Sequence, residues 1–131
     1  MISTRGRYAL RVMLDIAEHQ GDGYVPMKDV AARQNLSLKY LEQFLPALTK
    51  NKLLEGIQGR GGGYRLTRKP KDYTIREILK STEIELAPVS CLSENAEECP
   101  RKTACRTIKF WEGLNHVIND YLESNSLADL L

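Results

Sequence analysis

The chain has 131 residues, of which 42% are hydrophobic and 27% are charged, and its formal net charge is +2. This length is enough for one hydrophobic core, so the chain is not a miniprotein that depends on disulfides. Charged residues are scattered through the apolar positions of residues 1–20. We therefore expect neither a signal peptide nor a membrane span, and we expect a cytoplasmic protein that does not bind membranes.

The net charge is unequally distributed along the chain. Residues 1–80 contain fifteen Lys or Arg against eight Asp or Glu, whereas residues 81–131 contain four against nine. A basic amino-terminal part points to nucleic acid as its partner. An ordinary solvated surface is the alternative explanation of scattered basic residues.

The first helix is predicted to begin after Ser3, a good helix cap, and to end near Gly21. A turn follows at residues 21–23, and residues 24–26 contribute at most a very short strand. The apolar residues of this helix recur at three- and four-residue steps: Ala9, Leu10, Met13, Leu14, Ile16 and Ala17.

Two more helices complete a helix-turn-helix pattern. Residues 28–34 predict a short second helix, and Ser37 is a good cap for a third. The third helix has Leu41, Phe44, Leu45 and Leu48 on one face. Pro46 removes a backbone hydrogen bond, so we expect a kink there. The part before the kink is long enough to enter a DNA major groove.

Residues 53–67 predict a β-hairpin with a glycine-rich tip at residues 59–63. The tip is not a dinucleotide fingerprint, because Tyr64 stands where the last glycine is needed and no helix follows directly. Glycines allow close approach to a phosphate backbone while Arg60 reaches into a groove. After a helix-turn-helix, such a hairpin has the form of a winged-helix wing; a plain flexible turn is the alternative.

The carboxy-terminal part has two predicted helices separated by an irregular segment. A capping box at Thr74 starts the fourth helix, which ends near Ser81, and residues 83–102 lack periodicity. The last helix is predicted over residues 103–124 and would be roughly 33 Å long. Its apolar stripe is too long for so small a domain to cover, which predicts packing against the same helix of a second copy; packing on its own domain is the alternative. The stripe comprises Ile108, Trp111, Leu114, Val117, Ile118, Tyr121 and Leu122.

Cys91, Cys99 and Cys105 are the only cysteines, with the spacing C-x7-C-x5-C. Their odd number leaves one thiol outside any disulfide framework, and neither spacing is that of a zinc knuckle or a dithiol oxidoreductase. Three thiolates on a short segment suit an iron-sulfur cluster whose fourth ligand comes from elsewhere. Zinc and unligated or redox-active thiols are the alternatives. Basic neighbours and a predicted helix start at Cys105 favour the thiolate form; these neighbours are Arg101, Lys102 and Arg106.

Four motifs resemble one known family, the iron-sulfur-responsive winged-helix transcription regulators that include IscR, NsrR and RirA. The motifs are Ser3-Thr4-Arg5-Gly6-Arg7-Tyr8-Ala9-Leu10-Arg11, Ser37-Leu38-Lys39-Tyr40-Leu41-Glu42-Gln43, Gly61-Gly62-Gly63-Tyr64 and the cysteine triplet. The resemblance covers essentially the whole chain and is nearest to the IscR-like members. It implies a homodimer that binds partly palindromic promoter DNA. It also implies a 2Fe-2S or 4Fe-4S cluster near the dimer interface that reports iron, iron-sulfur supply, oxygen or nitric oxide.

The resemblance also implies roles for individual residues. Lys39 would neutralise phosphate, Gln43 would pair with adenine, and Glu42 would accept a hydrogen bond from cytosine. The helix dipole explains Glu42 equally well. The residues implied to contact DNA are Ser37, Lys39, Tyr40, Glu42 and Gln43, with Arg60 and Gly61 in the wing; those implied to hold the cluster are Cys91, Cys99 and Cys105.

Several positions differ from the pattern of this family. IscR-like wings have an arginine before the first glycine and a proline after it, where this chain has Gln58 and Arg60. The groove contact is therefore expected to shift by two residues. IscR-like proteins have a histidine where Ile108 stands, and NsrR-like proteins have an aspartate where Arg7 stands.

These differences leave the fourth cluster ligand open. His116 would lie roughly 16 Å along the last helix from Cys105, beyond the reach of its side chain. The remaining candidates are His19, Glu97, Glu98, an amino-terminal group of a partner chain, water and a small thiol.

The predicted fold class is mainly α, with three parts. They are a winged helix-turn-helix DNA-binding domain at residues 1–82, a cysteine-bearing cluster loop at 83–102, and a dimerisation helix with the C-terminal tail at 103–131. The predicted function is a homodimeric, sequence-specific transcription regulator controlled by an iron-sulfur cluster. A metal-free winged-helix regulator that responds to thiol oxidation or to a partner enzyme, for example in cysteine metabolism, is the alternative. The sequence has no paired general acid and base and no cofactor loop, so we expect no catalytic residues and no enzyme activity.

Overall fold

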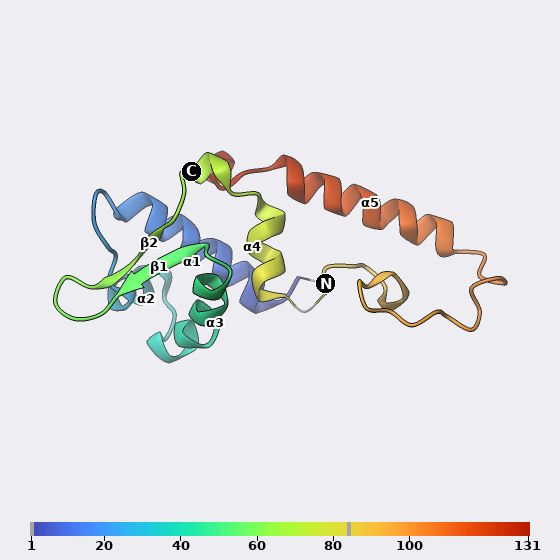
Figure 1. The fold of residues 1–131 in the computed structure, drawn as a ribbon, viewed down its shortest axis with the longest axis horizontal. Coiled ribbons are helices and arrows are strands. Elements are labelled where there is room, and N and C mark those ends of the chain that lie inside the picture. Colours follow the sequence, from blue (N-terminus) through green and yellow to red (C-terminus); the bar gives the residue numbers. More distant parts are fainter. Residues whose placement is uncertain (1, 84) are drawn as a thin grey trace.

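A computed structural model describes residues 2–83 and 85–131 of the chain (Figure 1). Four helices and a β-hairpin form one domain, and a fifth helix, α5, extends away from it with the irregular segment that precedes it alongside (Figure 1). The elements of the domain are α1 (Thr4–His19), α2 (Met27–Gln34), α3 (Leu38–Lys50), β1 (Leu54–Ile57), β2 (Gly63–Leu66), a short 3-10 helix η1 (Pro70–Asp72) and α4 (Ile75–Thr82).

Side-chain caps fix the starts of three helices where the sequence predicts them. The Ser3 and Ser37 hydroxyl oxygens accept hydrogen bonds from the backbone N–H groups of Gly6 and Tyr40, at 3.2 and 3.0 Å. Thr74 accepts in the same way from Glu77 at 3.0 Å. Each cap satisfies a backbone donor that the first helical turn leaves unpaired. The helix α3 continues through Pro46 to Lys50, and the kink at Pro46 stays a prediction.

The hairpin is antiparallel, with Leu54 opposite Leu66 and Ile57 opposite Gly63. Residues 24–26 contribute one isolated bridge, in which Val25 and Tyr64 exchange backbone hydrogen bonds of 2.8 and 2.9 Å. This single bridge agrees with the expectation of at most a very short strand, and it ties the loop after α1 to β2 beside the tip of the hairpin.

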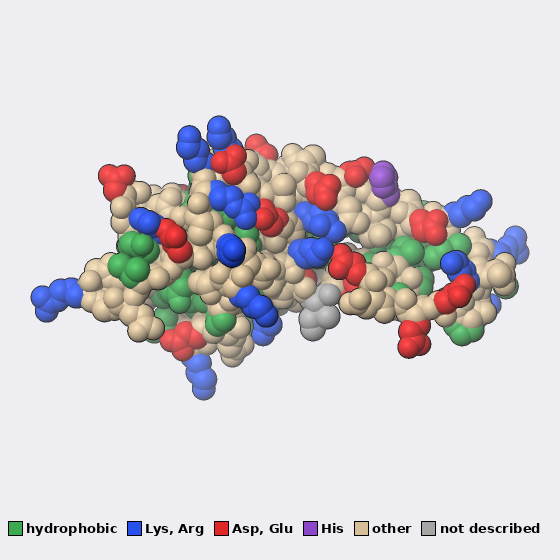
Figure 2. Space-filling model, viewed as in Figure 1, with side chains coloured by type: hydrophobic (Ala, Val, Ile, Leu, Met, Phe, Trp, Pro, Cys, Tyr) green, Lys and Arg blue, Asp and Glu red, His purple; other side chains and the backbone are tan. Residues whose placement is uncertain are grey.

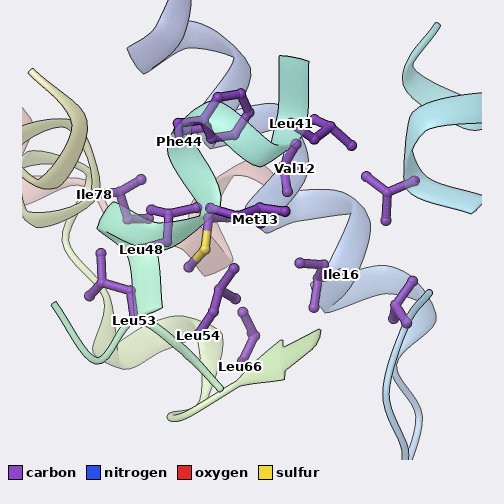
Figure 3. Close-up of a cluster of buried hydrophobic side chains, with 14 of the residues drawn as sticks. Val12, Met13, Ile16, Leu41, Phe44, Leu48, Leu53, Leu54, Leu66 and Ile78 are labelled. Atoms are coloured by element: carbon purple, nitrogen blue, oxygen red, sulfur yellow. The ribbon is translucent and has the colours of Figure 1, made fainter. Parts of the chain in front are cut away.

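The hydrophobic core lies between α1, α3, α4 and the hairpin (Figure 3). Burying a side chain of this size contributes roughly 1.5–3 kcal/mol. The labelled core residues are Val12, Met13, Ile16, Leu41, Phe44, Leu48, Leu53, Leu54, Leu66 and Ile78.

The last helix, α5 (Ile108–Ser124), begins five residues later than the sequence predicts. Its 17 residues span about 26 Å. The expected start at Thr103 is wrong because residues 101–107 form turns and bends.

The predicted apolar stripe of α5 is divided between two directions. Leu122 packs with Ile75 and Leu79 of α4, and Ile118 adjoins them. Leu114, Val117 and Tyr121 of the stripe point to solvent instead, with 36%, 63% and 68% of their surface exposed. Phe110, which the predicted stripe did not include, is exposed beside them at 67%. The helix therefore packs on its own domain along one edge and leaves the other edge free.

The chain returns to the domain core after α5. The backbone N–H of Leu127 donates to the Tyr73 carbonyl at 3.0 Å, and that of Ile75 donates to the Asn125 carbonyl at 2.9 Å. Leu127 begins a final 3-10 helix, η3 (Leu127–Leu130), and is fully buried in the main core. None of the helices in the described ranges is both long and apolar enough to span a bilayer.

Candidate nucleic-acid interface and cysteine pocket

The first two turns of α3 present polar side chains to solvent. Ser37, Lys39, Glu42 and Gln43 are exposed, whereas Tyr40 is half-buried. None of the ion pairs among the described residues includes Lys39 or Glu42. Their charges are therefore available to a partner at this surface.

Aromatic contacts hold Tyr40 between α1 and the rest of α3. Its ring lies edge-on to Tyr8 with the centroids 5.7 Å apart, and edge-on to Phe44 at 5.8 Å. The Arg11 guanidinium stacks over the Tyr8 ring, 4.9 Å from its centroid. The orientation of Tyr40 thus depends on the position of α1.

Glycines allow the tight turn at the tip of the wing. Gly59 and Gly61 have φ angles of +92° and +78°, a region that other residues rarely adopt. The Gly62 N–H donates to the Gly59 carbonyl at 3.0 Å. Arg60 is exposed between the two positive-φ glycines, so its side chain can extend from the tip.

The base of the wing is anchored by Tyr73. The Tyr73 hydroxyl donates to the Leu53 carbonyl at 2.8 Å and accepts from the backbone N–H groups of Thr67 and Arg68 at 2.8 and 3.1 Å. These bonds join the strand ends to the segment before α4. They fix the direction in which the wing leaves the domain.

One basic residue near this surface was not singled out from the sequence. Arg5, on the exposed first turn of α1, lines the same surface groove as Tyr40 of α3. Lys and Arg side chains are spread over this domain in Figure 2. The sequence contains no local signal for Arg5, because its proximity to α3 results from helix packing.

The three cysteines line a single pocket of about 420 Å³ at the amino-terminal end of α5. All three are free thiols; Cys91 is exposed, while Cys99 and Cys105 are partly covered. Carboxylates and apolar groups form the rest of the wall, and Figure 2 shows acidic and apolar side chains together around this end of the molecule. The other lining residues are Leu92, Ala96, Glu97, Glu98, Lys102, Ile108 and Glu112.

Hydrogen bonds from Thr107 lower the pKa of the Cys105 thiol below its ordinary value. Its Sγ lies 3.6 Å from the Thr107 Oγ1, and the backbone N–H groups of Thr107 and Ile108 add to the effect. The positive charge of Arg101 makes the smallest contribution. The expected thiolate stabilisation is thus present at Cys105, but the helix end causes it more than the basic neighbours do.

The candidates for the fourth ligand, and the excluded His116, lie at different places in the structure. Glu97 and Glu98 line the pocket, with Glu98 also 3.8 Å from the Lys102 ammonium. His19 lies instead at the end of α1, where its Nδ1 is 2.8 Å from the Asp15 carbonyl oxygen. His116 pairs with Asp120 at 3.1 Å on α5.

Glu112 was missed by sequence reasoning although it lines the pocket. It follows Ile108 by four residues, so the two share a face of α5. The described residues contain no group of three His, Cys, Asp or Glu side chains close enough to hold a metal ion. The donors are therefore gathered in one pocket without being at ligand distance from one another.

Comparison with known proteins covers nearly the whole chain. The model of the Rrf2 family, described as an iron-dependent transcriptional regulator, matches residues 2–131. The HTH-type transcriptional regulator IscR of Aliivibrio salmonicida is 35% identical over 130 residues, which are 99% of this chain and 76% of that protein. The IscR of Photorhabdus laumondii is also 35% identical, with 78% of its length covered.

Solved structures agree with the sequence comparison. CymR, the global cysteine regulator of B. subtilis, is 34% identical with a TM-score of 0.80, covering 99% of this chain and 95% of that chain. IscR of T. potens is 33% identical with a TM-score of 0.76, covering 99% and 85%. The sequence and the structure of the chain thus both match IscR regulators, and the protein belongs to the Rrf2 family of DNA-binding transcriptional regulators.

Proposed function

We propose that the protein is a cytoplasmic, homodimeric regulator whose promoter binding is controlled by an iron-sulfur cluster held by Cys91, Cys99 and Cys105. The observation that carries this proposal is the single pocket that all three thiols line. The similarity of the protein to IscR regulators over 99% of the chain gives further support to the proposal.

The chemistry of the pocket suits such a cluster. Thiolates are the usual protein ligands of iron-sulfur clusters, and the lowered pKa of Cys105 increases its thiolate fraction. A carboxylate of the pocket wall would supply the fourth ligand: Glu97, Glu98 or Glu112. Both the 2Fe-2S and the 4Fe-4S type are compatible with this donor set. A bound cluster supplies one-electron redox chemistry.

The DNA contacts follow from the exposed end of α3 and the wing. In this proposal α3 enters the major groove, where Lys39 neutralises phosphate and Gln43 pairs with adenine. Glu42 accepts from a cytosine amino group. Ser37 and Tyr40 donate to phosphate oxygens, and Arg60 and Gly61 bring the wing to the neighbouring backbone or groove.

Dimerisation is assigned to the free edge of α5. Phe110, Leu114, Val117 and Tyr121 are spaced by four, three and four residues, which is the spacing of a two-helix seam. An exposed apolar row of this length favours pairing with a second copy. Two copies would present two recognition helices to half-sites about one DNA turn apart.

The test is anaerobic reconstitution of the full chain with iron and sulfide. Wild-type protein is expected to give visible absorption and a defined iron-to-sulfide ratio, and each of the single variants Cys91→Ala, Cys99→Ala and Cys105→Ala is expected to lose most of it. The same samples are then titrated with promoter DNA, with and without cluster. A variant that retains a full cluster excludes its cysteine as a ligand, and equal DNA affinity in both states would limit the metal to a structural role.

A metal-free thiol switch is the second candidate. It is favoured by the similarity to a cysteine regulator, CymR, with 95% of that chain covered, and by the lowered pKa of the Cys105 thiol. In this case anaerobic protein binds no cluster, and mild oxidation changes DNA affinity through Cys105. The reconstitution experiment separates the two candidates directly.

A further inference from the structure

The carboxylate of Glu83 binds the amino-terminal end of α1. The backbone N–H and the hydroxyl of Ser3 both donate to the same oxygen, Oε1, at 2.6 and 2.9 Å. Both donors belong to the residue that caps α1. A negative charge at this end of a helix is stabilised by the helix dipole and by charge-assisted hydrogen bonds.

Gly6 provides the space for this carboxylate. It is buried in the first turn of α1, and a Cβ added there would lie 2.1 Å from the Glu83 Oε1. No real Cβ tolerates that distance, so any other residue at position 6 would displace the Glu83 side chain. The contact is therefore sterically matched as well as hydrogen-bonded.

Glu83 also stands at a boundary in the chain. It is the residue that ends α4 and the first residue of the segment that carries Cys91 and Cys99. A movement of this segment would reach α1 through Glu83.

The same end of α1 adjoins α3. Ser3, Glu83 and Tyr40 line one surface groove, and Tyr8, one turn further along α1, contacts the Tyr40 ring at 5.7 Å. A continuous set of contacts thus runs from Glu83 through the first turns of α1 to Tyr40.

We propose that Glu83 is a positioning residue for DNA binding. Glu83 fixes the first turn of α1, and Tyr8 of the same helix sets the orientation of Tyr40. The start of the cysteine-bearing segment and the DNA-contacting end of α3 therefore both pack against the amino-terminal part of α1. The inference rests on the proposed DNA contact by Tyr40. It does not depend on any cluster, because the contacts are formed between groups of the chain itself.

The test uses the full-length chain without cluster, with Glu83→Ala and Glu83→Gln compared on promoter and random duplexes. The Ala variant removes the acceptor and is expected to weaken promoter binding about tenfold. The Gln variant keeps an amide oxygen that accepts both Ser3 bonds, so its affinity should stay within about threefold of wild type. Glu94→Ala is the matched control: it removes an exposed carboxylate of the same segment that pairs with Lys80 of α4 at 2.9 Å rather than with α1, and it should leave affinity unchanged.

Gly6→Ala makes the test specific. In the wild-type background it should weaken promoter binding as Glu83→Ala does, because the new methyl expels the carboxylate. In the Glu83→Ala background it should have no further effect. Additive effects of the two changes would overturn the steric link between Gly6 and Glu83.

Amide hydrogen exchange supplies a readout that needs no DNA. Glu83→Ala should accelerate exchange at residues 4–7 and 38–41, whereas Glu83→Gln and Glu94→Ala should not. Unchanged exchange at residues 38–41 in Glu83→Ala would overturn the coupling even if the cluster proposal holds. Failure of the cluster proposal appears separately, as absent visible absorption after reconstitution.

Discussion

Asp15 joins α1 to α2 through a carboxylate with 2% of its surface exposed. The Arg33 guanidinium donates to both of its oxygens, from Nε at 3.1 and 3.0 Å and from a terminal nitrogen at 2.6 Å, and the Gln34 amide donates at 2.8 Å. Burial alone raises the pKa of Asp15, but these bonds and the charge of Arg33 together lower it below its ordinary value. A buried carboxylate is thus held ionised between the first two helices of the DNA-binding domain.

Because the pKa of Asp15 is lowered in the folded chain, its ionisation stabilises the fold at neutral pH. That contribution is complete above the unfolded pKa of about 4 and is lost as pH falls through the lower folded value. Asp15→Asn is expected to lower the free energy of unfolding by about 2 kcal/mol at neutral pH, less than for a fully buried pair because Arg33 remains partly exposed. Urea unfolding from pH 7 to pH 3 should show the difference from wild type shrinking below about pH 4. Asp22→Asn, in an exposed turn, should show no such difference; a gap that stays constant with pH would contradict this assignment.

Glu112 is expected to be the fourth cluster ligand, because a side chain on a regular helix is better positioned than Glu97 or Glu98 on an irregular segment. Glu112→Gln should accelerate cluster loss to a chelator at least about tenfold, since a neutral amide is a weaker ligand. Glu97→Gln and Glu98→Gln are the matched controls, measured by the decay of visible absorption. Fast cluster loss in the Glu97 or Glu98 variant instead would identify that residue as the ligand. Equal cluster loss in all three variants would assign the fourth ligand to a group of the partner chain or to solvent.

At the scale of elements, the helix-turn-helix could be predicted closely and α5 only in part. Ser3, Ser37 and Thr74 are visible in the sequence as caps, and each accepts the expected backbone hydrogen bond. The start of α5 lacks such a signal. Thr107 caps it without a side-chain bond to the helix, and its hydroxyl pairs with Cys105 instead. The expected start at Thr103 was therefore not marked by a side-chain cap in the sequence.

The divided stripe of α5 selects the residues for a dimerisation test. Ile118 adjoins the cluster of α4 and Leu122, so replacing it would disturb the domain as well as a dimer. The double variant Leu114→Glu, Val117→Glu places two charges on the free edge alone. In a dimer paired along α5 these charges would be buried without partners. Sedimentation should show a monomer with an unchanged circular dichroism spectrum. Lys109→Glu, on an exposed position of the same helix, should remain a dimer; an intact dimer in the double variant would place the interface elsewhere.

The recognition helix and the wing should contribute differently to DNA binding. Lys39→Ala is expected to weaken all duplexes and to reduce the slope of log K against log salt by about one, because one phosphate contact is lost. Arg60→Ala is expected to cost about 1–3 kcal/mol, mainly on the promoter, if the wing reads a groove. Fluorescence anisotropy at several salt concentrations measures both, with Lys109→Ala on α5 as the control. An unchanged salt slope for Lys39→Ala would exclude its phosphate contact.

At the scale of the whole molecule, the two candidate sites lie at opposite ends (Figure 1). α3 and the wing belong to the domain of the first four helices, and the cysteine pocket lies at the far end of α5. The C-x7-C-x5-C spacing predicted that the thiols act together, and all three do line one pocket. Three other features depend on long-range packing that no local sequence pattern encodes. They are the position of Glu112 in the pocket wall, the groove lined by Arg5 and Tyr40, and the burial of Leu127.

Backbone hydrogen bonds between residues 125–127 and residues 73–75 attach the carboxy-terminal end of α5 to the DNA-binding domain. A rotation of α5 would therefore be centred on this attachment, which serves as its pivot. α5 ends at Ser124, shortly before Leu127, which is buried in the core; its other end, Ile108, lies about 26 Å along the helix from Ser124, beside the thiols. A displacement of about 2 Å among the thiols corresponds to a rotation of about 5° over that length. In a pair of chains joined along α5, each DNA-binding domain extends beyond its own pivot. A small change of angle between the two α5 helices would then change the distance between the two α3 helices. That distance must match the spacing of the two half-sites in the promoter.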